Sequence, residues 1–183
     1  MRGRDQTSWF PFARFIADSG YKVFTFDFRG YGKSTGTKDT RMDRDLEAAV
    51  AYMRAKGAQQ VVLIGASMGG TAVIELASES QVQGVAALSP PAEFGRINAL
   101  TAVESMVIPL LLIVSENDYQ YYSDARKIES AAAATQFLVV EGQQHGTNMI
   151  AEHRNEIFAN LLAFLDRWTC LLYTSPSPRD NTT

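Results

Sequence analysis

The residues best suited to chemistry lie in one stretch, residues 61–70, where four aliphatic residues lead into a Gly-x-Ser-x-Gly pattern. An apolar run bounded by glycine predicts a strand buried on both faces, and residues 71–80 predict a helix. A serine on a sharp strand-to-helix turn presents its hydroxyl clear of the sheet. We therefore predict that Ser67 is a nucleophile, with Gly65 and Gly69 leaving room for the helix to approach the strand.

The same turn predicts part of an oxyanion-binding site. The amide of Met68 is expected at the helix N-terminus, where an unpaired N–H group and the helix dipole stabilise negative charge. The competing interpretation is that Ser67 only caps the helix. A predicted strand before the motif and a predicted helix after it favour the nucleophile.

Two further predicted strands end close to groups that would complete this chemistry. Asp118 follows a strand at residues 110–114, and His145 follows one at residues 137–140. In open parallel sheets, functional groups gather at the carboxyl ends of the strands, and the order serine, acid, histidine is typical of a nucleophile elbow. A histidine can take the serine proton, while a carboxylate holds its other ring nitrogen protonated.

Other residues compete for these two roles. Glu116 lies too close to the strand end to be preferred as the acid, and Asp124 is better placed to support a helix N-terminus. His153 is the alternative base, but it is expected in the polar first turns of a helix and solvated. His145 could instead be a simple turn residue beside a glycine. Its position after the last predicted strand favours the base.

The elements that would position these residues alternate between strands and helices. This order predicts the α/β class, a parallel sheet with helices on both faces, in one domain. The predicted strands are residues 21–27, 61–64, 85–88, 110–114 and 137–140. The predicted helices are residues 8–19, 43–56, 71–80, one short helix between 91 and 109, one capped by Ser123, and one ending at Trp168.

Composition narrows the class of protein further. The net charge of −3 gives no reason to expect nucleic acid or an anionic membrane as partner. No apolar run reaches the length of a membrane span, and no signal segment opens the chain. Cys170 is the single cysteine, so no disulfide framework or cysteine metal site is predicted. We expect a cytoplasmic protein.

Residues 1–168 resemble serine hydrolases of the α/β-hydrolase fold. The resemblance is carried by residues 65–70, the loop at 27–34, residues 115–118 and the His-Gly pair at 145–146. It implies that Ser67 is the nucleophile, His145 the base and Asp118 the acid. It also implies a small-molecule acyl substrate, most simply a carboxylic ester, without a metal or organic cofactor. It does not indicate an oligomeric state.

The chain departs from the family pattern at its N-terminus. The family has three strands before its first helix, and the turn after the third donates a second oxyanion amide. Here the chain begins inside that turn, so we expect a domain that lacks its first strands, with Arg2 the nearest match to the donor. The missing third strand would lie between residues 21–27 and 61–64. These two segments would either pair directly or leave unpaired backbone that promotes aggregation.

Residues 169–183 are expected to form a disordered or artefactual tail that does not pack on the core. Helical periodicity stops at Trp168, and the segment after it resembles the translation of a sequencing-library adapter.

The sequence has features of two other functional classes. Residues 30–35 end like a phosphate-binding loop, but that loop requires glycine where Asp27 stands, so a nucleotide-binding protein is disfavoured. A non-catalytic binding module on the same fold is the stronger alternative. The presence of all three of Ser67, Asp118 and His145 argues against it.

Overall fold

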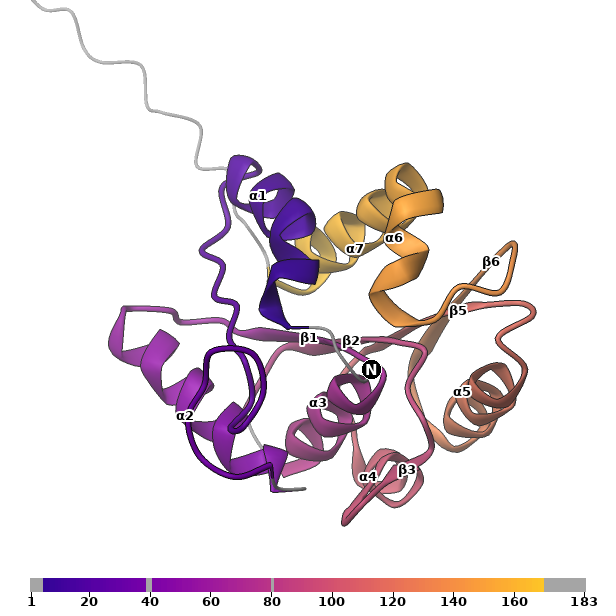
Figure 1. Cartoon of the computed structure of the whole chain (residues 1–183), viewed down its shortest axis with the longest axis horizontal. Helices are drawn as coiled ribbons and strands as arrows, with labels where there is room; N and C mark the ends of the chain where they lie inside the picture. Colours follow the sequence, from indigo (N-terminus) through magenta and orange to yellow (C-terminus); the bar gives the residue numbers. More distant parts are fainter. Residues whose placement is uncertain (1–4, 39–40, 80, 170–183) are drawn as a thin grey trace, which may run out of the picture.

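A parallel sheet of four strands forms the centre of the molecule (Figure 1). The computed structural model describes residues 5–38, 41–79 and 81–169. The strands lie in the order β1-β2-β5-β6, and all neighbours are parallel. Their bounds are β1 (Val62–Ala66), β2 (Gly84–Leu88), β5 (Leu110–Ser115) and β6 (Thr135–Val140). A short antiparallel pair, β3 (Glu93–Phe94) and β4 (Ile97–Asn98), lies outside this sheet.

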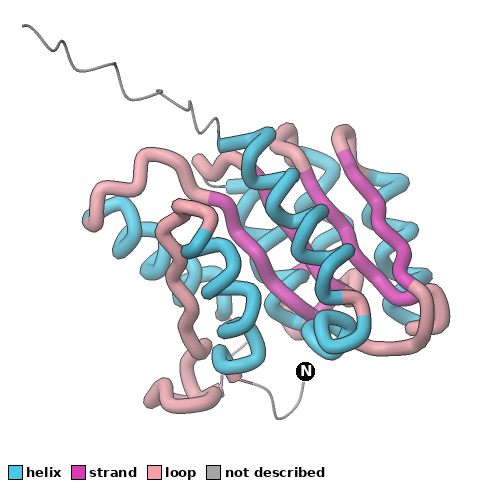
Figure 2. Tube along the Cα trace, turned by 90° about the horizontal axis from the view of Figure 1, so that it is seen from above, coloured by secondary structure: helices cyan, strands magenta, loops and turns pink. Residues whose placement is uncertain are grey.

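Helices cover both faces of the sheet, which confirms the predicted class (Figure 2). α1 and α7 pack on one face together with the short α6, and α2, α3, α4 and α5 pack on the other (Figure 1). The helices are η1 (Gln6–Trp9), α1 (Phe10–Asp18), α2 (Met42–Ala55), α3 (Met68–Glu79), α4 (Ala99–Ser105), α5 (Tyr119–Ala131), η2 (Gly146–Asn148), α6 (Met149–Glu152) and α7 (Arg154–Thr169).

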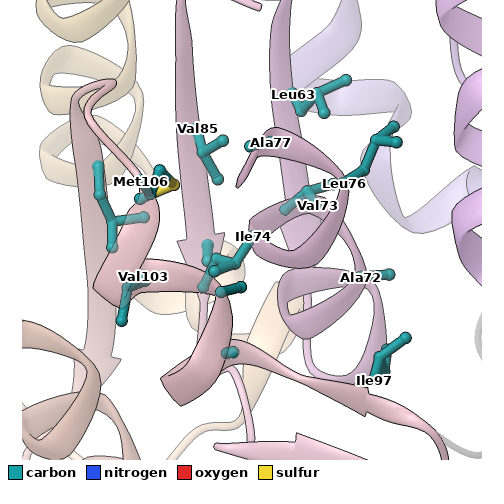
Figure 3. Packing of buried hydrophobic residues seen from close by; sticks show 14 of the residues in the cluster. Leu63, Ala72, Val73, Ile74, Leu76, Ala77, Val85, Ile97, Val103 and Met106 are labelled. Carbon is teal, nitrogen blue, oxygen red and sulfur yellow. The ribbon is translucent and has the colours of Figure 1, made fainter. Parts of the chain in front are cut away.

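Two clusters of buried side chains, one on each face, hold these layers together. Because successive side chains of a strand point to opposite faces, Leu110 and Leu112 enter one cluster, while Leu111 and Ile113 enter the other. Every residue of β2 and β5 is buried, which explains why these strands read as continuous apolar runs. Figure 3 shows the first cluster, in which Ile74 of α3 lies beside the sheet.

The predicted start of the helix after β5 is wrong. α5 begins at Tyr119, because the amide of Tyr122 already donates to the carbonyl of Asp118 at 2.8 Å. Ser123 therefore lies inside the helix, on its exposed side, and does not cap it.

The predicted strand at residues 21–27 is also wrong. These residues are extended, but the structure assigns them to no strand and pairs them with no described neighbour. A cavity of about 520 Å³, the edge cavity, lies between residues 21–28 and β1, with side chains of α1 and α2 also in its lining. Direct pairing of the two segments, one of the two expected outcomes, does not occur. A strand requires a hydrogen-bonded neighbour. Here side-chain contacts hold the segment: Phe24 packs against Tyr52 with ring centroids 4.9 Å apart, and the hydroxyl of Thr25 donates to the side chain of Gln6 at 3.1 Å.

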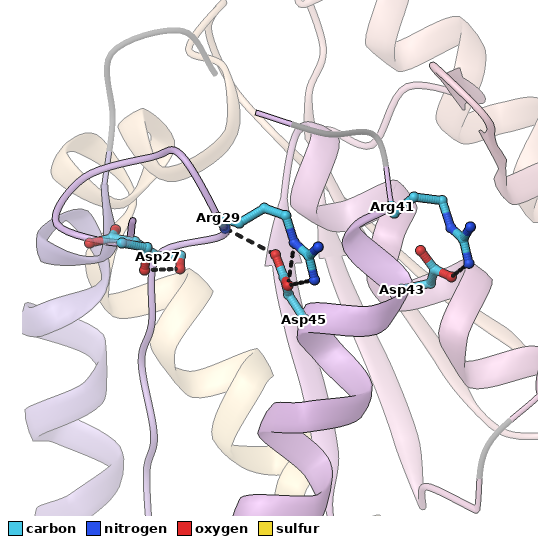
Figure 4. A network of polar contacts seen from close by, with 6 residues as sticks. Asp27, Arg29, Arg41, Asp43 and Asp45 are labelled. Carbon is cyan, nitrogen blue, oxygen red and sulfur yellow. Dashed lines mark hydrogen bonds and ion pairs between the residues drawn. The ribbon is translucent and has the colours of Figure 1, made fainter. Parts of the chain in front are cut away.

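Polar contacts fix the loop that follows this segment (Figure 4). The buried carboxylate of Asp27 accepts hydrogen bonds from the backbone amides of Gln6 and Lys33, at 2.7 and 3.1 Å. Arg29 donates from its side chain and its backbone to Asp45 in α2. Burial raises the pKa of Asp45, but these hydrogen bonds from Arg29 lower it more, so the pKa lies below its ordinary value.

α7 extends to Thr169, one residue beyond the predicted end of the helical region. Residues 170–183 lie outside the described part of the chain. They make up all of the predicted tail except its first residue. Arg2 also lies outside the described residues. The division into residues 1–168 and 169–183 therefore stays a prediction. None of the helices in the described ranges combines the length and apolar character that a membrane crossing requires.

Candidate active site

Ser67 forms the turn between β1 and α3. Its φ of 53° lies in the left-handed region, which is costly for a residue with a side chain. The turn is anchored because the Ser67 amide donates to the carbonyl of Leu88, at the end of β2, at 2.8 Å. Ser67 is a buried residue, with an exposed fraction of 5%.

Only one of the two predicted packing glycines lies at a close contact. A Cβ added to Gly65 would lie 2.2 Å from the carbonyl oxygen of Gly69, far inside van der Waals distance. A Cβ at Gly69 would meet only the ring of Phe28, at an ordinary 3.7 Å. Gly70 is the tighter of the two helix positions, with Pro90 at 3.1 Å. The helix therefore approaches β1 at Gly65, while Gly70 faces Pro90 and Ala87 at the neighbouring strand β2.

His145 lies between the other two predicted residues. Its Nε2 is 2.9 Å from the Ser67 hydroxyl, and its Nδ1 is 2.7 Å from a carboxylate oxygen of Asp118. The carboxylate can only accept, so Nδ1 carries the proton and Nε2 is left to accept from the hydroxyl. The side chains of His145 and Asp118 are 22% and 11% exposed. The structure thus brings together three residues separated by up to 78 positions in sequence.

Neither competing acid reaches His145. Glu116 accepts from the side chain of Asn117, and Asp124 accepts from the amide of Ala92 and pairs with Lys127. Asp118 is held in place because its amide donates to the carbonyl of Ser115 at 3.2 Å.

The competing histidine lies elsewhere and is not simply solvated. His153 falls between α6 and α7, and its Nε2 donates to the carbonyl of Glu141 at 2.8 Å. This hydrogen bond stabilises the loop after β6.

Tyr121 is a site residue that the sequence reasoning missed. Its ring centroid lies 4.0 Å from that of His145, with the planes tilted by 41°. Tyr121 is three residues after Asp118, which is the N-cap residue just before α5. That spacing is the one signal in the sequence that could have indicated it.

Of the two predicted oxyanion donors, the structure describes one. Met68 is the first residue of α3, whose first amides have no partner within the helix. Arg2 lies outside the described residues, so its role stays a prediction.

The lining of the edge cavity does not include Ser67, Asp118 or His145, but it includes Ala66 and Met68, the residues on either side of Ser67. Across the described ranges, no three side chains of His, Cys, Asp or Glu gather as the ligands of a metal ion would.

Comparison with known proteins relates this fold to a family. A family model described as "alpha/beta hydrolase fold" matches residues 5–125. The protein of Escherichia coli (strain K12) named "Uncharacterized protein YfhR" is 29% identical over 90 residues, which cover 47% of this chain and 31% of that protein. The chain thus matches less than a third of this relative's length.

Solved structures share the fold across most of the chain. An esterase of Pyrococcus furiosus has a TM-score of 0.74 at 23% identity, covering 88% of this chain and 75% of that chain. A monoacylglycerol lipase of Paleococcus ferrophilus has a TM-score of 0.75 at 16% identity, covering 89% and 90%. At these sequence identities, the two solved structures share the fold with this chain, and nothing further follows from the similarity.

Proposed function

Because the chain belongs to the α/β-hydrolase fold family, we propose that it is a serine hydrolase that cleaves a carboxylic ester or a related acyl bond. One observation carries the proposal. Nε2 of His145 lies 2.9 Å from the hydroxyl of Ser67 while Nδ1 lies 2.7 Å from Asp118, which is the geometry of a nucleophile, a base and an orienting acid.

The first half of the reaction forms an acyl-enzyme. Oγ of Ser67 attacks the ester carbonyl carbon, and its proton moves to Nε2 of His145. The imidazolium is stabilised by the Asp118 carboxylate. The tetrahedral intermediate then collapses: the bond to the leaving alcohol breaks, and Nε2 returns the proton to the departing oxygen. The acyl group remains on Ser67.

The second half restores the enzyme. A water molecule gives one proton to Nε2 of His145 and attacks the acyl carbon. The bond to Oγ of Ser67 breaks, the proton returns to that oxygen, and the carboxylic acid leaves. In both halves the substrate oxygen becomes negative. The amide of Met68, at the N-terminus of a 12-residue helix, is positioned to stabilise that charge.

The relatives support an acyl substrate without specifying one. The titles of two similar structures name an esterase and a monoacylglycerol lipase. Both act on esters, so a carboxylic ester is the first substrate class to test. The chain matches less than a third of the length of the Escherichia coli relative. Hydrolase activity of a whole protein of that length is therefore also a proposal.

The test is hydrolysis of p-nitrophenyl esters of increasing acyl length by the wild-type chain and by Ser67→Ala. We expect turnover in the wild type and a fall in kcat of about three to six orders of magnitude in the variant. Asp118→Asn, which keeps the size of the acid, should also lower kcat severely. Equal hydrolysis by wild type and Ser67→Ala would contradict the proposal and favour a non-catalytic binding module.

A further inference from the structure

Three adjacent strands end in serine at the same edge of the sheet. Ser67 follows β1, Ser89 follows β2, and Ser115 is the last residue of β5. β1 and β2 are in register, with Ala66 opposite Leu88, so the first two serines leave the sheet side by side. The sequence reasoning assigned no role to Ser89 or Ser115. Both are fully buried, with exposed fractions of 0%.

Ser115 connects the segment that carries the acid with the segment that carries the base. Its hydroxyl donates to the carbonyl oxygen of Gln144, the residue before His145, at 2.7 Å. Its own carbonyl accepts the amide of Asp118 at 3.2 Å. A displacement of Ser115 would therefore change the position of both residues.

Ser89 holds the other side of His145. Its hydroxyl accepts from the amide of Gly146, the residue after His145, at 3.1 Å. Its φ of 46° lies in the left-handed region, and its amide donates to the carbonyl of Ile113 at 2.8 Å. A residue held in such a conformation indicates that the surrounding contacts determine its backbone.

We propose that Ser89 and Ser115 are positioning residues for His145, an inference that rests on the proposed serine hydrolase function. Their hydroxyls fix the peptide groups on both sides of a base that stands on a loop, where backbone is otherwise mobile. The 2.9 Å contact between Nε2 of His145 and the hydroxyl of Ser67 is then maintained by the strand ends as well as by the loop. A misplacement of about 1 Å at such a contact can cost about a hundredfold in rate.

The test compares p-nitrophenyl ester hydrolysis by wild type, Ser115→Ala and Ser89→Gly. Glycine adopts the left-handed conformation at no steric cost, so Ser89→Gly removes the hydroxyl while it relieves the backbone. We expect kcat to fall about tenfold to a hundredfold in each variant, with KM within about twofold of wild type. Ser115→Thr retains the hydroxyl and should recover most of the lost kcat.

Thr169→Val is the matched control. Thr169 is 7% exposed, and its hydroxyl donates to the carbonyl of Leu165 at 2.7 Å, the same kind of buried bond far along α7. This variant should lose stability without losing kcat. Unchanged kcat in both Ser115→Ala and Ser89→Gly, or an equal loss in Thr169→Val, would overturn the positioning role while leaving the hydrolase intact. If the Ser67→Ala variant hydrolysed esters as fast as the wild type, the proposed function would be overturned, and the positioning role with it.

Discussion

Gly65 at the end of β1 lies directly against the backbone of Gly69 in α3. A single methyl group on Gly65 would stand 2.2 Å from the carbonyl oxygen of Gly69, 2.5 Å from its carbonyl carbon and 2.9 Å from the amide nitrogen of Gly70. These atoms are backbone and cannot turn aside as a side chain could. The sharp turn that presents Ser67 therefore depends on the absence of a side chain at position 65.

Gly65→Ala should destabilise the protein, whereas Gly69→Ala should not. The first change drives a methyl into backbone and should lower the free energy of unfolding by about 1–3 kcal/mol or more. The second meets only an ordinary contact with Phe28 and replaces glycine in a helix, which should raise the free energy of unfolding by up to about 1 kcal/mol. Urea unfolding curves measure both changes in the free energy of unfolding, provided that the dependence on urea concentration has the same slope in wild type and variant. Equal effects at the two positions would contradict the close approach.

Asp45→Asn should make stability less dependent on acid pH. The pKa of Asp45 is held below its ordinary value, so its contribution is present above about pH 4 and is lost as the pH falls through the native pKa. The variant should be less stable by about 1–2 kcal/mol near neutral pH, and the difference should narrow as the pH falls. Unfolding curves from pH 7 to pH 2.5 test this.

Asp43→Asn provides the control for this measurement. Asp43 is more exposed than Asp45, and its contact with Arg41 is longer, at 3.5 Å. Its loss should change stability by less than about 1 kcal/mol. A constant difference between wild type and Asp45→Asn at every pH would show that the carboxylate charge is not what stabilises the loop.

Backbone amides of residues 22–26 should exchange their hydrogens quickly. The described structure gives this segment no strand partner, whereas the amides of β2 and β5 lie in hydrogen-bonded ladders between buried neighbours. We expect exchange at least about a hundredfold faster in residues 22–26 than in the two central strands, measured by NMR. Comparable protection would mean that another segment pairs with residues 22–26.

The outer edge of β1 should promote self-association. β1 pairs with β2 on one side, and the edge cavity lies along the other. An unpaired edge is a template for pairing with another chain. The apparent molar mass measured by light scattering should rise with protein concentration, and Ile64→Lys, which places a charge in the cavity lining, should reduce that rise. An apparent molar mass that stays independent of concentration would contradict this prediction.

Local motifs predicted the four strands of the sheet and the three residues of the candidate site because each motif follows an apolar strand. The apolar run before Ser67, for example, specifies both the strand and the place where it ends. Residues 21–27 have a similar pattern, but a strand also requires a neighbour, and a local pattern cannot supply one. Tyr121, Ser89 and Ser115 were missed for a related reason. Their contacts with the loop around His145 arise only when strands distant in sequence are brought together.

Covalent labelling with a fluorophosphonate tests the central claim most directly, because such a reagent reacts with a serine only when a base activates it. We predict one adduct per chain by intact-mass measurement, located at Ser67 by peptide mapping, and no adduct in Ser67→Ala or His145→Ala. An adduct at another serine, or labelling of Ser67 that persists in His145→Ala, would contradict the assignment of Ser67 and His145 as nucleophile and base.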